Sequence, residues 1–423
     1  MKELYVSVFD LIMCMSGAMD MINPSVVDHH KRVAYIAFSI GKEMALSLEE
    51  QNNLILAGLL HDSGALYLKE RLATLEFELE NPYRHAERGY LLLRNFQPFH
   101  KIAHMVRYHH TPWTDAMAGY RDIPLESHIL HLADRISVLI DNREKNIVWQ
   151  GKHIIEQINR FSEKLFNPDL LDVFKSLSGK ESFWLDASSP FIGFILSRRT
   201  KLPSIELNLK ELINLGKLFC QIIDFRSHFT ATHTSGVAAS AETLARLSGF
   251  SERECHSMRL AGYLHDLGKL AVPSEILEKP GKLTEEEFSI IRSHTYYTYI
   301  TLEHISEFDV INSWASFHHE RLDGRGYPFH LNKQDLSIGS RIMSVADVFT
   351  ALTEDRPYRT GMDSEKTMKT IRTMAENSAL DKYIVELLED NFDEINNCRA
   401  QAQKKAREEY KEFEESGNKE MSL

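Results

Sequence analysis

The heptapeptide LAGLLHD at residues 56–62 returns almost unchanged as LAGYLHD at residues 260–266. The first histidine of each half keeps the same register, because His29 aligns with His233 without a gap. A chain of 423 residues is also too long for one ordinary hydrophobic core. The internal repeat therefore predicts two domains of the same fold.

The repeat extends along one ordered series of histidines and aspartates. His85 and His294 each lie 24 residues before a pair of adjacent histidines. An aspartate within a helical stretch, Asp134 or Asp347, closes each series. The same order in both halves indicates that these residues gather at one site in each domain.

The apolar periodicity of the chain is that of helices. Apolar residues recur at three- and four-residue spacing, as in GVAASAETLARLSGF at residues 236–250, and alternating patterns typical of strands are scarce. We expect an all-α protein of two tandem helical domains, each with its own His-Asp pair, at residues 1–200 and 205–398, followed by a charged tail at 399–423. The tail carries mixed charges and hardly an apolar face, so we expect a solvated helix that frays.

Composition narrows the class of partner. The net charge of −12 argues against binding to a nucleic-acid polymer, but it allows a small anionic substrate held by metals. The four cysteines form no CxxC pair, which favours a reducing, cytoplasmic location. No basic segment precedes the apolar N-terminus and no apolar stretch could span a bilayer, so we expect a soluble protein. The 20 histidines direct attention to metal binding.

The second half supplies five imidazoles and two carboxylates in its ordered series. These residues are His233, His265, Asp266, His294, His318, His319 and Asp347. Mixed nitrogen and oxygen donors suit iron, manganese, nickel or zinc rather than magnesium or calcium. Asp266 has two oxygens and is the natural bridge between two ions. Such a pair lowers the pKa of a bridging water and stabilises both oxygens of an in-line displacement at phosphorus, which predicts phosphodiester hydrolysis.

Three motifs of the second half together resemble the HD-GYP family of the HD phosphohydrolase superfamily. They are LHDLGK at residues 264–269, HHERLDGRGYP at 318–328 and VADVFTALTEDRPYR at 345–359, and the resemblance covers about residues 205–390. It implies a helical protein with two or three iron or manganese ions. It also implies hydrolysis of a cyclic dinucleotide, cyclic di-GMP or 3′3′-cyclic GMP-AMP, to a linear dinucleotide with a 5′-phosphate.

The resemblance assigns roles to individual positions. The seven residues of the ordered series match the metal ligands of the family, and Asp266 and Lys269 match its catalytic pair. Lys269 would contact the scissile phosphate or assist the leaving oxygen. The matching substrate-binding positions are Arg325, Gly326, Tyr327, Pro328, Arg341, Arg356 and Arg359, with a surface salt-bridge role equally compatible with Arg325 and Arg341.

One position departs from the three-metal members of the family. Those members have a glutamate one helical turn before the first histidine, and here Phe229 stands there. Because a phenylalanine cannot ligate, we expect two divalent transition metal ions, iron or manganese, with nickel or zinc as alternatives.

The first half keeps a complete ordered series without the surrounding catalytic motifs. It provides a second candidate metal site, made of His29, His61, Asp62, His85, His109, His110 and Asp134. Ala65 stands where the second half has Lys269, and HHTPWTD replaces the GYP loop. Two interpretations follow: a scaffold, sensor or dimer partner, or a centre that hydrolyses something else, such as the 5′-phosphate of the linear product. His30 is an alternative to His29 as ligand, although the gapless alignment favours His29.

Two other functions use parts of the same pattern. A different HD-type nucleotide phosphohydrolase would need the metals but not the GYP loop. A non-catalytic sensor of cyclic dinucleotides would have lost ligands in the second half, where the series is complete. The choice between the two cyclic dinucleotides, the metal and the oligomeric state, with a homodimer as one candidate, all stay open.

Overall fold

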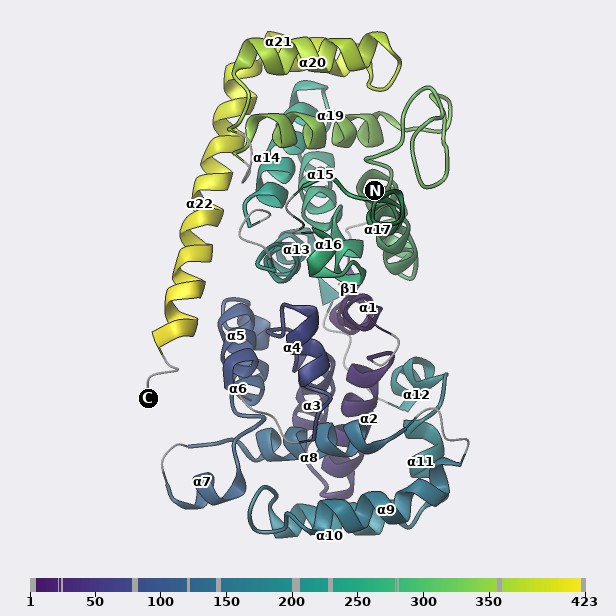
Figure 1. Cartoon of the computed structure of the whole chain (residues 1–423), viewed down its shortest axis with the longest axis vertical. Coiled ribbons are helices and arrows are strands. Elements are labelled where there is room, and N and C mark those ends of the chain that lie inside the picture. The colour runs from purple at the N-terminus through teal and green to yellow at the C-terminus, as the bar shows by residue number, and fades with distance from the viewer. Residues whose placement is uncertain are drawn as a thin grey trace. The chain divides into compact units, whose positions relative to one another are not determined.

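The computed structural model describes residues 5–21, 23, 26–77, 83–119, 122–141, 146–199, 206–226, 231–277, 279, 281–355 and 360–419. The chain divides into two compact units. The N-terminal unit comprises Leu11–Ile205 with Glu415–Leu423, and the C-terminal unit comprises Glu206–Glu414 with Met1–Asp10. Both units are helical, which confirms the expected all-α class (Figure 1).

The helices of the N-terminal unit follow a first helix, α1 (Val8–Asp20), that begins in the other unit. They are α2 (His29–Glu43), α3 (Leu48–Leu60), α4 (Leu68–Ala73), α5 (Tyr83–Leu93), η1 (Gln97–Phe99), α6 (His100–Arg107), α7 (Trp113–Met117), α8 (Leu125–Leu139), α9 (Ile147–Asn159), α10 (Pro168–Ser178), α11 (Glu181–Ala187) and α12 (Ile192–Arg199).

The C-terminal unit repeats this order and adds helices after it. Its helices are α13 (Leu209–Asp224), α14 (His233–Leu247), α15 (Glu252–Leu264), η2 (Leu267–Ala271), α16 (Ser274–Leu277), α17 (Glu285–Glu303), η3 (Ser306–Phe308), α18 (Asp309–Ser316), α19 (Ile338–Thr353), α20 (Ser364–Glu376), α21 (Lys382–Asp390) and α22 (Phe392–Lys419). The two named strands among the described residues, β1 (Val6–Ser7) and β2 (Glu206–Leu207), form one short antiparallel pair in this unit.

Each unit builds its site on the same three helices. α2 packs against α3 and α8, and α14 packs against α15 and α19. α3 and α15 both begin in a capping box, with Ser47 or Ser251 as cap and a glutamate three residues on. At Gly58 and Gly262 a Cβ would lie 2.5 Å from a Cα of the facing helix. Glycine is therefore required for the close helix contact that brings the His-Asp pair near the first histidine.

The charged stretch from Arg399 continues α22, and the expectation that it has hardly an apolar face is wrong. Its buried positions include Arg399, Gln403, Ala406 and Phe413, and Tyr410 is half-buried. They recur at intervals of three and four residues and so lie on one face of the helix. The ring of Phe413 packs against Phe225 at the end of α13, with 5.0 Å between centroids. Because charged residues occupy the other faces of the helix, this narrow buried face is hard to recognise in the sequence.

None of the helices that the structure describes is long and apolar enough to cross a membrane. The predicted domain boundaries stay predictions.

Candidate metal centres

The structure brings the predicted ligands of the C-terminal unit together as two groups of three. One group is His233, His265 and Asp347, and the other is His294, His318 and His319, with the donor atoms of each within 4.8 Å of one another. Asp266 reaches both groups with different oxygens. Its Oδ2 lies 3.2 Å from Nε2 of His265, and its Oδ1 lies 3.4 Å from Nε2 of His294. This is the arrangement expected of a carboxylate that bridges two ions.

Four of these imidazoles are oriented by partners on Nδ1. The Nδ1 atoms of His265, His294 and His318 lie 2.6–2.8 Å from the backbone carbonyl oxygen three residues earlier. The Nδ1 of His233 lies 3.0 Å from the buried carboxylate of Glu354, a residue not predicted from the sequence. An N–H donated on this side leaves Nε2 as the acceptor that faces the cluster, as in histidine ligands of metals.

Most groups of the cluster have the protonation states of metal ligands. His233 differs: burial alone would lower its pKa, but Glu354 and Asp347 raise it to about 10. Burial lowers the pKa of His294 to about 3 and holds that of His318 well below its usual value. Burial alone would raise the pKa of Asp266, but His265 and Lys269 hold it well below its usual range. Neutral imidazoles and ionised carboxylates are the forms that bind divalent metals. The buried Nε2 of His265 also has no hydrogen-bond partner, so the residues fit metal ions.

One side of the C-terminal cluster is open, at His319, Lys269 and Tyr327. The side chain of His319 is 31% exposed, and Lys269 is 20% exposed with its Nζ 2.5 Å from Oδ2 of Asp266. The Tyr327 ring lies 5.0 Å from the His319 ring, and the guanidinium of Arg292 lies over Tyr327 at 4.9 Å. Arg292 was not predicted from the sequence.

The GYP loop forms the rim of this open side. A Cβ on Gly326 would lie 2.4 Å from the backbone nitrogen of Arg321, so only glycine fits where the loop folds back. The backbone N–H of Tyr327 donates to the carbonyl of His319 at 3.2 Å, which joins the loop to the ligand. Arg325 is exposed beside it, and Pro328 is half-buried.

Among the other predicted substrate contacts, Arg341 has protein partners and the remaining ones lie outside the described residues. The guanidinium of Arg341 donates to the carbonyl oxygens of Lys333 and Leu336 and binds Asp381 at 3.0 Å. These contacts join the loop before α19 to Asp381 at the start of α21, and substrate binding by Arg341 stays a prediction. The remaining predicted residues, Arg356, Arg359 and the departure at Phe229, lie outside the described residues.

Two features fix the turn that carries Lys269. A Cβ on Gly268 would lie 1.9 Å from the carbonyl oxygen of His294, so η2 lies directly against α17. The buried guanidinium of Arg226 donates to the carbonyl of Lys269 at 2.7 Å and to that of Val272 at 3.0 Å. Arg226 was also not predicted, because nothing in its local sequence marks it.

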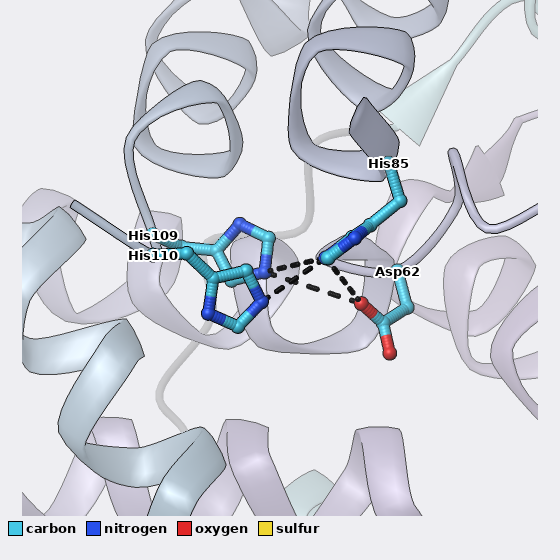
Figure 2. Close-up of side chains that lie close together, drawn as sticks. All are labelled: Asp62, His85, His109 and His110. Carbon is cyan, nitrogen blue, oxygen red and sulfur yellow. Dashed lines mark hydrogen bonds and ion pairs between the residues drawn. The ribbon is translucent and has the colours of Figure 1, made fainter. Parts of the chain in front are cut away.

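The N-terminal unit gathers its own series in the same manner. His85, His109 and His110 lie together with Asp62, and Nε2 of His85 lies 3.3 Å from Oδ1 of Asp62 (Figure 2). The remaining predicted ligands join this group through shared members, in the sets His29, His61, Asp62 and His61, His109, Asp134. The orientation is also repeated, since Nδ1 of His61 and of His109 faces the carbonyl three residues earlier at 2.8 and 2.6 Å.

The two clusters differ in what surrounds the ligands. Oδ2 of Asp62 accepts a hydrogen bond from Thr74 Oγ1 at 2.8 Å, where its counterpart Asp266 meets Lys269. Arg135 lies 2.6 Å from Asp134 and donates to the carbonyls of Thr74 and Glu76. The side chain of His110 is 2% exposed, in contrast to the partly open His319. The N-terminal cluster is thus buried throughout.

Comparison with known proteins identifies the class. Residues 26–139 and residues 217–384 each match the HD domain family. The 3′3′-cGAMP-specific phosphodiesterase 1 of Vibrio cholerae is 32% identical over 392 residues, which are 89% of this chain and 90% of that protein. The chain therefore belongs to the HD-domain phosphodiesterases, and the resemblance to the HD-GYP family is confirmed.

Two further relatives place the chain within that class. A cyclic di-GMP phosphodiesterase of Pseudomonas aeruginosa is 40% identical over 149 residues, 35% of each chain. The crystal structure of a cyclic GMP-AMP-specific phosphodiesterase of V. cholerae matches with a TM-score of 0.63 and 25% identity. That match covers 92% of this chain and 98% of the other, so both units have counterparts there.

Proposed function

We propose that the C-terminal centre hydrolyses a 3′,5′-cyclic dinucleotide to a linear dinucleotide with a 5′-phosphate. The observation that carries the proposal is the open side of this centre, where Lys269 lies on the carboxylate that joins both ligand groups. The relative that is similar over almost the whole chain makes 3′3′-cyclic GMP-AMP the first candidate substrate. Cyclic di-GMP is the second candidate, by similarity to shorter stretches of other relatives.

Two divalent transition metal ions, iron or manganese, fit the C-terminal residues best, with nickel or zinc as alternatives. Two groups of three ligands joined by one carboxylate support a count of two, and imidazole with carboxylate suits these metals. When bound, such ions activate water and stabilise charge on phosphoryl oxygens.

Lys269 would stabilise the charge that develops during the reaction. Burial alone would lower its pKa, but Asp266 beside it raises the pKa above the usual value, so the amine stays protonated at neutral pH. An ammonium group held beside the bridging carboxylate provides N–H donors for a phosphoryl or leaving oxygen.

Residues of the GYP loop would position the dinucleotide. Burial raises the pKa of Tyr327, so its phenol stays protonated and can donate a hydrogen bond. The exposed guanidinium of Arg325 suits a substrate phosphate. Gly326 and Pro328 hold the backbone of the rim in place, and we assign Arg356 and Arg359 to the same substrate by family resemblance.

The test is direct hydrolysis. Purified protein loaded with iron or manganese is incubated with each cyclic dinucleotide, and the products are separated by chromatography and identified by mass. We expect a linear dinucleotide that carries a 5′-phosphate. Turnover of neither substrate by protein with intact metal content would overturn the proposal, and turnover of guanosine tetraphosphate or deoxynucleotides instead would favour another HD-type nucleotide hydrolase.

We also propose that the N-terminal cluster binds divalent transition metals. Polar atoms of His29, His61, Asp62 and Asp134 are buried there without hydrogen-bond partners, a costly arrangement that metal ions would relieve. The burial of His110 supports a scaffold or sensor role rather than hydrolysis of the linear product. Conversion of His61 and Asp62 to alanine tests the scaffold or sensor role. If the product keeps its 5′-phosphate only in the variant, the N-terminal centre would instead hydrolyse that phosphate.

We place the reaction in the cytoplasm, which the absence of a CxxC pair among the four cysteines supports. A homodimer stays a prediction that light scattering of the purified chain would test.

A further inference from the structure

A histidine outside the predicted ligand series, His30, lies in the N-terminal cluster. His30 lies beside His29 at the start of α2 and is 1% exposed. Its ring lies 5.2 Å from the ring of His61 and 5.6 Å from that of His29, between centroids. His30 is therefore part of the cluster rather than of the surrounding apolar core.

The C-terminal centre has no equivalent of this histidine. The gapless alignment that pairs His29 with His233 pairs His30 with Thr234. Thr234 donates through Oγ1 to Asp224 at 2.8 Å, whereas Nδ1 of His30 contacts Oδ1 of the counterpart Asp20. Both aspartates are buried, so the same carboxylate holds a hydroxyl in one half and an imidazole in the other.

The contact with Asp20 determines what the other ring nitrogen of His30 can do. A histidine that donates Nδ1–H to a carboxylate has its lone pair on Nε2, as in carboxylate–histidine–metal arrangements. Nε2 of His30 is buried and has no hydrogen-bond partner. The same holds for Nε2 of His29 and His61, whereas in the C-terminal centre His265 is the one described histidine ligand with such an atom. Unpartnered buried nitrogens of this kind are rare and need an explanation.

We propose that His30, oriented by Asp20, is a further metal ligand of the N-terminal centre. This inference rests on the proposal that this centre binds metal. It gives the N-terminal centre an imidazole donor that the C-terminal centre lacks, and it assigns Asp20 as the positioning residue of that donor. The ion is a divalent transition metal, since imidazole donors select this class.

The test isolates the N-terminal centre within the full chain. A parent carrying His265→Ala and Asp266→Ala has lost two C-terminal ligands, so its tightly held ions report on the N-terminal centre. His30→Thr is then added, because Thr234 already forms the equivalent contact in this protein. His128→Gln is the control, because His128 is a buried histidine of the same unit whose ring packs against Trp113.

Two measurements are made on each variant: metal affinity by competition with a chelator, and the visible spectrum of the cobalt(II)-loaded protein. We expect His30→Thr to weaken binding by at least about ten-fold and to change the cobalt bands, because loss of a ligand exceeds the about 10–100-fold effect of losing its orienting partner. Asp20→Asn should weaken binding while keeping the bands closer to those of the parent. His128→Gln should match the parent in both.

The outcomes separate this inference from the proposals beneath it. Parent-like affinity and spectrum in His30→Thr would overturn the role of His30 alone. A parent without bound ions would overturn the proposed N-terminal metal centre together with the role of His30. It would not bear on the activity proposed for the C-terminal centre of the unmodified protein. If His30→Thr lowers the melting temperature, His30→Gln keeps an amide donor for Asp20, and the same two measurements apply to it.

Discussion

One chemical difference between the two centres lies at Oδ2 of the aspartate in the His-Asp pair, Asp266 or Asp62. In the C-terminal centre this oxygen lies 2.5 Å from the ammonium group of Lys269. In the N-terminal centre it accepts a hydrogen bond from the hydroxyl of Thr74. A protonated amine at this position can stabilise negative charge that develops on a substrate oxygen, whereas a hydroxyl carries no positive charge. We therefore assign the difference in function between the halves to this contact.

Replacement of the amine tests this assignment. Lys269→Ala should lower kcat for the cyclic dinucleotide by about 100- to 1,000-fold, the usual effect of removing one donor to a developing anion. Metal content should stay near that of the parent, because Lys269 is not a ligand. Lys366→Ala, at an exposed lysine of α20, is the control and should leave kcat unchanged. Steady-state rates with metal analysis of the same samples decide it, and an unchanged kcat in Lys269→Ala would contradict the assignment.

The ligands could be predicted from the sequence, but the residues that orient them could not. Histidine and aspartate at repeated spacing carry their own chemical signature. Glu354 and Arg226 carry none, because each meets its partner only after α19 and α13 have packed beside the ligand helices. For Arg341 the sequence allowed either substrate binding or a salt bridge, and the structure shows an ion pair with Asp381.

At the scale of elements, the contact between α14 and α15 positions the first histidine of the C-terminal centre. Of the glycines in α14 and α15, Gly262 lies closest to the partner helix. Gly262→Ala would force the helices apart, because its Cβ would lie 2.5 Å from the Cα of Ala238. The shift would move His233 away from His265.

We expect Gly262→Ala to destabilise the C-terminal unit by about 1–3 kcal/mol, as overpacking of a core does, and to lower metal affinity. Thermal melting and metal content measure both effects. Gly17→Ala is the control, since Gly17 lies in α1 with no atom within 4 Å of its added Cβ. That change should be neutral or slightly stabilising. A parent-like melting profile for Gly262→Ala would contradict the role given to the helix contact.

The sparse buried face of α22 supports the end of α13. Phe413 packs against Phe225, which precedes the arginine that holds the carbonyl of Lys269. Phe413→Ala should therefore lower the stability of the C-terminal unit by about 3 kcal/mol, from the size of the side chain. Phe191→Ala is the matched control, because that ring is 70% exposed. Melting curves compare the two, and equal melting temperatures would contradict a packed α22.

At the scale of the whole chain, the two similar centres differ in how far their histidines are exposed to solvent. The predicted ligand His319 is partly exposed, whereas its counterpart His110 is buried. The repeat in the sequence predicted two centres, but it could not predict this difference in burial. Access depends on the segments around the predicted ligands. In the N-terminal unit this segment includes Thr74 and Glu76, whose carbonyls accept hydrogen bonds from Arg135, and in the C-terminal unit it is the GYP loop. The sequences of these two segments do not align.

The difference in access predicts two phases of metal release. A chromogenic chelator should remove ions rapidly from the C-terminal centre and more slowly from the N-terminal centre. Asp266→Ala should abolish the fast phase, and Asp62→Ala should abolish the slow one. Absorbance followed over time measures both phases. A single phase in the parent, or loss of the fast phase in Asp62→Ala, would contradict the prediction.

The pairing of β1 with β2 bears on how the protein can be divided for experiments. A fragment that starts at the repeat boundary near residue 205 would lack β1, which pairs Val6 with Leu207. It would also lack the buried side chains of Val6 and Val8. The unpaired edge of β2 would then be free to pair with another molecule. A C-terminal fragment designed from the sequence repeat alone should accordingly aggregate more readily than one to which residues 5–10 have been joined.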